Sequence, residues 1–231
     1  IPLFLVGIWA WFSLKSIPVV ASFKEQMDIF GDKHTWYCTL TYFMTFGTFA
    51  GMAAAFPMMI KSLYVPLESD LDPLKFAFYG PLIGSATRVF FGKIADKTGG
   101  AILTHITGIA LIILFSVLIF GGFLTPTTID QFPYFVGIVM LIFFFTGIGN
   151  AATFKQFPMI FSDSPRKAAG VIGWTAAIAA FGPFVFNVLI STSKSISGDA
   201  RLFFGLMLFI CVFATFINWK FYTKKGCERP S

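Results

Sequence analysis

Six long apolar segments constrain this chain of 231 residues more than any other feature. A helix needs about 20 predominantly apolar residues to cross a bilayer, and backbone groups in lipid must find their hydrogen bonds within the segment. The sequence therefore predicts an all-α integral membrane protein. Its six expected spans are Trp36–Ile60, Phe76–Ala95, Ala101–Phe123, Phe132–Phe154, Ala168–Ile190 and Leu202–Trp219.

The composition excludes several other classes of protein. Charged residues make up 12% of the chain, about half the share that soluble domains carry. The 3 cysteines are odd in number and do not suggest a disulfide scaffold. The net charge of +6 comes from scattered cations rather than a basic stripe, so we expect membrane lipid and no nucleic acid as a partner.

No catalytic or metal-binding pattern accompanies the apolar segments. The 2 histidines have no Cys, His or carboxylate at a metal-ligand spacing. The sequence also lacks a phosphate-binding loop and a Ser-His-Asp set that the spans could bring together. It predicts neither an enzyme nor a bound cofactor or metal.

The polar stretches divide the chain into four parts. Residues 1–12 are apolar but too short to cross, so we interpret them as the end of a preceding transmembrane helix in a larger protein. Residues 13–35 form a linker, 36–219 hold the six spans, and 220–231 form a tail. Within the linker, apolar residues at helical spacing favour an amphipathic helix over a solvated segment; they are Val20, Phe23, Met27 and Phe30.

Loop charges predict the orientation. Lys and Arg are concentrated on one side of the spans, in the linker, the tail and loops that hold residues such as Lys93, Lys97 and Arg166. The positive-inside rule places that side in the cytoplasm. We therefore expect a multi-pass protein of the inner or plasma membrane, with its linker and tail cytoplasmic.

Arg88 is the one cation near the middle of a predicted span. A central arginine costs from about 3 to more than 10 kcal/mol unless it has a partner, and the 11 acidic residues all lie in loops or near helix ends. An unpaired guanidinium that faces a cavity predicts an anion-binding site. The alternative is a structural arginine that pairs with backbone carbonyls or with an acid outside this chain.

Small residues surround Arg88 along its helix. Five residues recur at intervals of four along this helix: Gly80, Gly84, Arg88, Gly92 and Asp96. Successive members of such a series lie within about 40° of one another around the helix axis. This spacing predicts a face that another helix or a ligand can approach closely. We expect Gly84, Gly92 and Asp96 to serve helix packing or gating.

Three further residues are candidates for lining the site. Tyr42 and Phe46 lie one helical turn apart and offer a hydroxyl and a flat apolar wall, and Asn150 is an amide within an apolar span. Taken alone, the two aromatic residues would more often face lipid or pack in the core than line a site. Four glycines in two small-residue stretches are candidates for close helix packing: Gly147, Gly149, Gly173 and Gly182.

One loop carries a family resemblance. The segment from Gly92 to Gly100, GKIADKTGG, resembles the G-x-x-x-D-[KR]-x-G-G loop of the major facilitator superfamily, which occurs once in each six-helix half. A linker followed by six spans then resembles the carboxyl-terminal half of such a transporter. The resemblance implies a missing amino-terminal six-helix half as a partner.

Within that superfamily the chain resembles the nitrate/nitrite porters. The matching pieces are Tyr42-x-x-x-Phe46 followed by Gly-Thr-Phe, the segment Gly80–Arg88, and the segment Thr146–Phe161. The resemblance implies that Arg88 is one of two arginines, one from each half, that clamp the anion. It places Tyr42 and Phe46 in the same site and Asn150 close to it.

The family's glycine-rich signature on the penultimate helix is only partly kept. Ala179 and Pro183 stand where glycines are usual. Because of this departure, the resemblance predicts the substrate and the helix packing less specifically than it predicts the role of Arg88.

The resemblance implies alternating access of a central site to nitrate and nitrite. Guanidinium cannot lose its proton, and the spans offer no central carboxylate as a proton carrier. These two points favour nitrate/nitrite exchange. Proton-coupled symport, another small anion, and a non-transporting subunit or channel stay open as alternatives.

Overall fold

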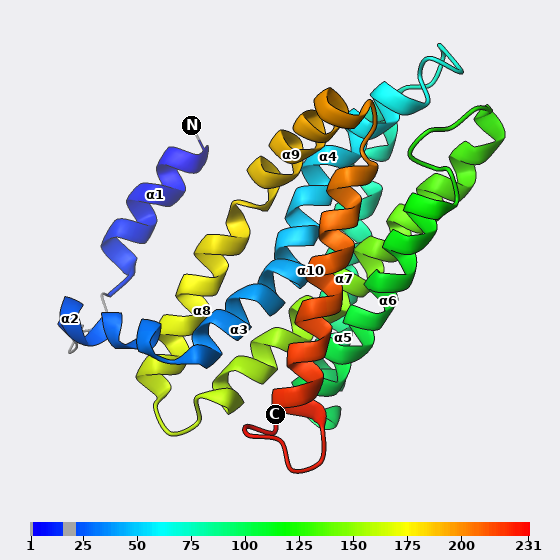
Figure 1. The fold of residues 1–231 in the computed structure, drawn as a ribbon. Coiled ribbons are helices and arrows are strands. Elements are labelled where there is room, and N and C mark those ends of the chain that lie inside the picture. Colours follow the sequence, from blue (N-terminus) through cyan, green and yellow to red (C-terminus); the bar gives the residue numbers. More distant parts are fainter. Residues whose placement is uncertain (1, 16–21) are drawn as a thin grey trace.

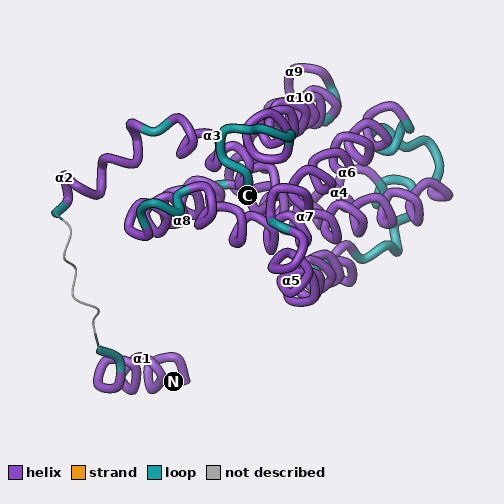
Figure 2. The backbone as a smooth tube through the Cα atoms, turned by 90° about the horizontal axis from the view of Figure 1, so that it is seen from below, coloured by secondary structure: helices purple, strands orange, loops and turns teal. Residues whose placement is uncertain are grey.

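The computed structural model describes residues 2–15 and 22–231 (Figure 1). This part of the chain is helical and contains no strand. Six helical rods run side by side, with α1 (Pro2–Ser13) apart from them (Figures 1 and 2). The rods are α3–η2–α4 (Lys33–Leu63), α5 (Tyr79–Thr98), α6 (Gly100–Phe120), α7 (Phe132–Ile160), α8–α9 (Pro165–Ser197) and α10–η5 (Arg201–Thr223).

The rods lie where the six apolar segments predict them. Five are long and apolar enough to cross a membrane. The sixth, α5, has 20 residues but falls short of that apolar character. It carries Arg88, Lys93, Asp96 and Lys97. The predicted all-α membrane fold is thus confirmed, with α5 as its least apolar rod.

Helix α7 lies at the centre of the packing. It packs along α5 on one side and α6 on another, while α10 packs on α6 and α9 on α4. Its buried rings Phe135 and Phe143 meet Phe56 of α4 in the main core. This core fixes the position of α7 relative to the first rod, and α5 packs along α7.

The first rod contains a π-helical turn. Helix α3 (Lys33–Tyr42) passes into η2 (Phe43–Gly47), which has π geometry, and α4 (Thr48–Leu63) continues the rod. Turns of this kind are rare and frequently mark functional sites. The Thr45 hydroxyl donates to the carbonyls of Thr41 and Tyr42, both at 3.3 Å, and so helps to satisfy backbone groups at this irregular turn.

The fifth rod is interrupted beside the same turn. Helix α8 (Pro165–Ala180) ends before Phe181, and α9 (Gly182–Ser197) begins after it. Pro183 explains the break, because proline lacks an N–H and its ring clashes with the carbonyl four residues earlier. A Cβ built at Gly182 would lie 2.3 Å from the Gly47 carbonyl oxygen, so only glycine permits this approach.

The linker differs from the single amphipathic helix that its sequence favours. The described residues form α2 (Phe23–Gln26) and the 3₁₀ helix η1 (Met27–Gly31), and residues 16–21, with Val20, lie outside the described part. The tighter 3₁₀ turn has 3.0 residues rather than 3.6, which changes the residue that faces the bundle. Ile29 is buried, whereas Met27 is exposed.

The tail folds back onto the end of the bundle where α3 begins (Figure 1). Arg229 pairs with Asp32 at 3.0 Å, and Glu228 pairs with Lys33 at 2.7 Å. The backbone N–H of Ala101 donates to the Ser231 carbonyl oxygen at 3.0 Å. The linker, tail and start of α6 are therefore joined at one end of the molecule.

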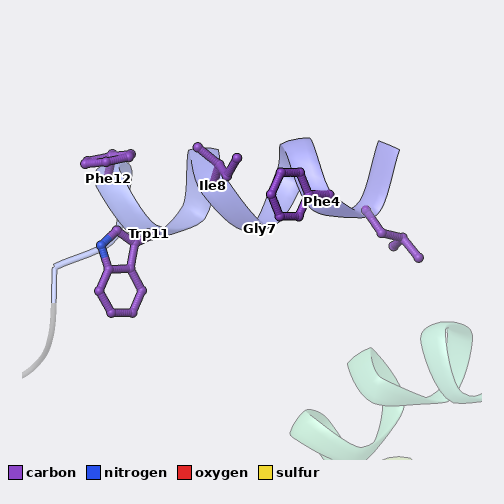
Figure 3. A pocket seen from close by; sticks show the side chains of 6 residues that line it. Phe4, Gly7, Ile8, Trp11 and Phe12 are labelled. Carbon is purple, nitrogen blue, oxygen red and sulfur yellow. The ribbon is translucent and has the colours of Figure 1, made fainter. Parts of the chain in front are cut away.

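Helix α1 has no buried residue. A shallow hollow against it is lined by apolar side chains of α1 alone (Figure 3). A hollow formed by one helix without a converging polar group lacks the features of a ligand site. That residues 1–12 end a preceding span stays a prediction.

Candidate functional site

Arg88 lies near the middle of α5, and its side chain is exposed on the surface of the bundle. Its guanidinium carbon lies 5.0 Å from the centroid of the Phe154 ring. Among residues 2–15 and 22–231, no hydrogen bond or ion pair involves Arg88. The donors of a guanidinium at mid-helix are thus free to bind a group from outside this chain.

The Phe154 ring of α7 lies beside this guanidinium, and two rings of the first rod continue the cluster from it. Phe154 meets Tyr42 edge-on, with centroids 5.8 Å apart and planes at 84°. Tyr42 stacks on Phe46 at 5.5 Å and 20°. We call Arg88, Phe154, Tyr42 and Phe46 the Arg88 cluster. The structure thus brings together three residues that the sequence proposes as neighbours.

The positions of Tyr42 and Phe46 depend on the π turn. Tyr42 is the last residue of α3, and Phe46 lies within η2. Tyr42 is buried at 4% exposure, and Phe46 is half-buried. The Tyr42 hydroxyl has no hydrogen-bond partner in the described part of the chain, so it can serve as a donor within the Arg88 cluster.

Asn150 is buried within α7 at 2% exposure, and its Oδ1 has no hydrogen-bond partner among the described residues. Seven residues turn a helix by about 700°, so Asn150 shares a face with Phe143 and Phe157. Those two rings contact Phe49 and Tyr42, which places Asn150 opposite η2. An amide can turn either its oxygen or its nitrogen to a partner. Direct contact between Asn150 and Arg88 is not observed.

Four of the predicted packing glycines lie at close helix contacts. A Cβ built at Gly147 would lie 2.4 Å from the Gly84 carbonyl oxygen, and one at Gly84 would lie 2.5 Å from the Phe49 ring. A Cβ at Gly149 would meet Thr45 at 2.5 Å. With Gly182 against Gly47, these contacts hold α5 against α7 and hold α7 and α9 against the π turn.

Gly92 and Gly173 have open space around them, with nothing within 4 Å of a built Cβ. For Gly92 the reason is the 40° drift at each four-residue step. Gly80, at the start of the four-residue series, is buried against Phe143. Arg88 and Asp96, further along the series, lie on the exposed side of the helix. The five residues therefore do not share one face along the whole helix.

Asp96 pairs with Lys155 of α7, with Nζ 3.5 Å from Oδ1. Both side chains are partly exposed. The pair joins the end of α5 to α7 and leaves Asp96 far along the helix from Arg88. Its role in gating stays a prediction.

Sequence reasoning did not identify Phe154. The chain has 32 phenylalanines, so no compositional signal separates this one from the rest. Its position one helical turn after Asn150 is the signal that could have found it. Phe154 is 40% exposed, and its ring completes the Arg88 cluster.

Comparisons with known proteins bear on this cluster. No protein-family model matches the chain. A probable nitrate/nitrite antiporter, NarK2 of Thermus thermophilus, is 50% identical over 232 residues, which cover 100% of this chain and 51% of that protein. The chain is a homologue of nitrate/nitrite transporters. It is similar to the nitrate/nitrite transporter NarU of Escherichia coli, at 30% identity over 94% of this chain and 51% of NarU.

A probable nitrate transporter, NarT of Staphylococcus epidermidis, is 27% identical over 84% of this chain and 46% of its own length. The chain spans about half the length of the curated relatives that it matches. The resemblance to nitrate/nitrite porters and the helical fold of the major facilitator type are thus confirmed. The roles of the individual site residues stay predictions.

Proposed function

We propose that this chain is the carboxyl-terminal half of a transporter that moves nitrate and nitrite across a membrane by alternating access. The observation that carries the proposal is the unpaired guanidinium of Arg88 at mid-helix, in one cluster with the free hydroxyl of Tyr42. A charge at the middle of a membrane-spanning helix marks a functional site by default. The names of the curated relatives support this choice of anion.

The Arg88 cluster suits a small planar oxyanion. A guanidinium presents parallel N–H donors that bind two oxygens of one anion, whereas an ammonium is a point charge. The Tyr42 hydroxyl supplies a further donor, and the stacked ring of Phe46 supplies a flat apolar wall. These groups distinguish a flat anion with several oxygens from a spherical one.

The rest of the site comes from a second half in this proposal. The Arg88 side chain lies on a surface that the described residues leave open. An amino-terminal six-helix half with its own central arginine would cover this surface and close the anion between two cations. Alternating access then follows from rocking of the two halves around the site.

Membrane lipid is the other expected partner. On α6, exposed isoleucines recur at spacings of four, three and four residues, which makes one apolar stripe along the helix. They are Ile102, Ile106, Ile109 and Ile113. We place this stripe against lipid in the inner or plasma membrane, with the linker and tail on the cytoplasmic side.

Exchange of nitrate for nitrite fits the charges of this half. Among the described residues, the acid of α5 is Asp96 near its end, and Arg88 stays charged at any accessible pH. With two arginines, an empty site would carry a net positive charge that opposes its return through the membrane. A bound anion reduces this charge, so exchange is favoured over proton-coupled symport.

The test of substrate binding is Arg88→Lys in the full-length protein that contains this chain. The substitution keeps the charge but removes the fork, and we expect nitrate and nitrite binding to fall at least about 10-fold, the loss of one strong charge-assisted hydrogen bond. Binding is measured by titration calorimetry on the purified protein. Unchanged affinity would make Arg88 structural.

The test of exchange is nitrate uptake into vesicles that hold nitrite or no anion, with and without an inward proton gradient. Exchange predicts uptake only into nitrite-loaded vesicles, whatever the proton gradient. Uptake that follows the gradient and ignores internal nitrite would favour symport. Saturation is expected for a carrier, and flux without saturation would indicate a channel.

A further inference from the structure

Helices α6 and α10 pack side by side (Figure 1), and a shallow hollow of about 280 Å³ lies against both of them near the start of the tail. It is lined by His105 of α6 and by Thr215, Phe216 and Trp219 of the last rod. The Thr215 hydroxyl already donates to the Cys211 carbonyl oxygen at 2.6 Å. His105 is therefore the lining residue whose side chain can offer a polar group to a ligand.

The His105 ring is half-buried and lies against the Thr215 backbone. Its Nδ1 is the enclosed ring nitrogen and has no hydrogen bond of good geometry among the described residues. Nε2 is then the nitrogen that a ligand can reach, and it donates a hydrogen bond in the tautomer that carries its proton there.

Two lysines lie beside the rings that line this hollow. The Lys220 ammonium is 6.0 Å from the centroid of the Phe216 ring, and the Lys224 ammonium is 5.4 Å from the ring of Trp219. Both lysines are exposed, and neither has an ion pair or a hydrogen bond from its side chain within the described part of the chain. Two positive charges thus border the hollow without a neutralising acid.

The π turn η5 (Trp219–Thr223) explains why these groups meet. The backbone N–H of Lys224 donates to the Trp219 carbonyl oxygen, five residues earlier, at 2.9 Å. Five residues of a regular α-helix rotate by about 500°, which would turn the two side chains about 140° apart. The wider turn instead places Lys224 over the Trp219 ring. Turns of this kind frequently accompany functional sites.

Apolar side chains continue both walls of the hollow toward the middle of the bundle. On α10, Phe209 and Phe213 precede Phe216 by seven and three residues, and both are exposed. On α6, Ile109 follows His105 by four residues and is exposed as well. Residues at these spacings share one helix face. Apolar surface therefore leads from the hollow into the region that hydrocarbon occupies.

The position of the hollow suits a lipid better than a soluble anion. His105 is the sixth residue of α6, so it lies about 8 Å along the helix from Gly100, at 1.5 Å per residue. Trp219 is 41% exposed, and tryptophan is enriched at the level of lipid headgroups. Sites for small soluble ligands enclose most of the ligand, which a shallow hollow does not. A lipid would cover the apolar walls with its own chains.

We propose that this hollow binds the headgroup of an anionic phospholipid. Its phosphate lies between the ammoniums of Lys220 and Lys224 and within reach of His105, and its acyl chains lie along Phe213 and Phe209. Two lysines at the rim favour a lipid with a net negative charge over a zwitterionic one. The inference depends on the membrane fold and not on the anion that the protein transports.

The first experiment measures the quenching of Trp219 fluorescence by brominated lipids. The full-length protein is held in phosphatidylcholine nanodiscs that contain increasing fractions of brominated phosphatidylglycerol or brominated phosphatidylcholine. The Trp219 signal is the difference between the wild-type protein and Trp219→Phe, which keeps a ring beneath Lys224. We expect half-maximal quenching at a fraction of the anionic lipid about 25-fold lower than that of the zwitterionic one, since each lysine contributes about 5-fold.

Charge variants distinguish a defined site from general attraction to the membrane surface. Lys220→Gln and Lys224→Gln should each reduce the preference for phosphatidylglycerol about 5-fold, and the double variant should remove it. Lys225→Gln is the matched control, because Lys225 is exposed and has no aromatic or acidic partner among the described residues. It removes the same charge and should leave the preference unchanged. An equal loss in all three single variants would overturn the site.

A second experiment tests the source of the phosphate. Phosphatidylglycerol added to the purified full-length protein in detergent should raise the thermal unfolding midpoint of the wild-type protein but not that of the double variant, because a ligand of the folded state stabilises it. Inorganic phosphate at the same concentration should neither raise the midpoint nor displace the lipid. Displacement would assign the hollow to a soluble anion and overturn the proposal.

Equal quenching of Trp219 by the two brominated lipids would overturn the proposal as well. Failure of the wild-type protein to bind nitrate or nitrite would overturn the proposed function and leave the lipid site standing. The two failures are therefore distinguishable.

Discussion

The contact between Gly147 and α5 leads to a quantitative prediction. A Cβ at Gly147 would lie 2.4 Å from the Gly84 carbonyl oxygen, 3.1 Å from the Gly84 carbonyl carbon and 3.0 Å from the Thr87 Cβ. Ordinary contact begins at 3.4 Å, so Gly147→Ala must push α5 away by about 1 Å. Two of these atoms belong to the backbone and cannot rotate aside. The strain therefore falls on the α5–α7 interface.

Overpacking of this kind costs about 1–3 kcal/mol, which lowers the unfolding midpoint by about 2–12 °C for a domain of this size. Thr87 immediately precedes Arg88, so the displacement also moves the guanidinium relative to the Phe154 ring. We expect nitrate affinity to fall together with the midpoint. Both are measured on the purified full-length protein, by thermal unfolding in detergent and by calorimetric titration.

Gly173→Ala is the matched control. Gly173 lies within α8, has open space around it, and gains about 1 kcal/mol of helix propensity on the change to alanine. Its midpoint should rise or stay constant, with nitrate affinity unchanged. The reasoning is refuted if Gly147→Ala is as stable as the wild-type protein, or if the two alanines lower the midpoint equally.

Three further predictions address other contacts. Tyr42→Phe removes a free hydroxyl of the Arg88 cluster, so nitrate affinity should fall about 10-fold or more, which is the value of a hydrogen bond to a charged group. The unfolding midpoint should stay constant. Equal affinity would exclude the hydroxyl from the site. The hydrogen bond from Lys33 holds the pKa of Glu228 below its ordinary 4.5, so the tail contact is complete above pH 4.5 and is lost as the pH falls through the lowered value. A fluorescent label on Cys227 should gain mobility only in that acidic range, and mobility that rises already near neutral pH would contradict this assignment. Asp96→Asn removes a partly exposed ion pair and should change the unfolding free energy by less than about 1 kcal/mol, as chemical denaturation can check.

The sequence predicts the six rods and the isolated cation because both follow from polarity alone. An apolar run of spanning length has few alternatives to a helix in lipid, and the absence of acids near Arg88 is visible by inspection. Tyr42 and Phe46 are found because one helical turn separates them. These features depend on spacing along one helix or on composition.

The remaining features depend on contacts between helices, which spacing does not determine. The π turn Phe43–Gly47 and the break at Phe181 meet through Gly47 and Gly182, and neither helix alone indicates the other. Phe154 belongs to the site because α5 and α3 bring Arg88 and Tyr42 to it. The linker differed from expectation because Ile29, rather than Met27, is buried against the bundle.

The low apolar character of α5 has a consequence for how the protein is made. Of the six rods, it alone falls short of the apolar character of a membrane span, and it carries Arg88 at its middle. The rod that holds it most extensively is α7, which is synthesised later. Helix α5 therefore leaves the ribosome before its main support exists, and its stable insertion awaits α7. Substitutions in α7 that loosen this contact, such as those at Gly147, should reduce the yield of inserted protein before any effect on transport is measured.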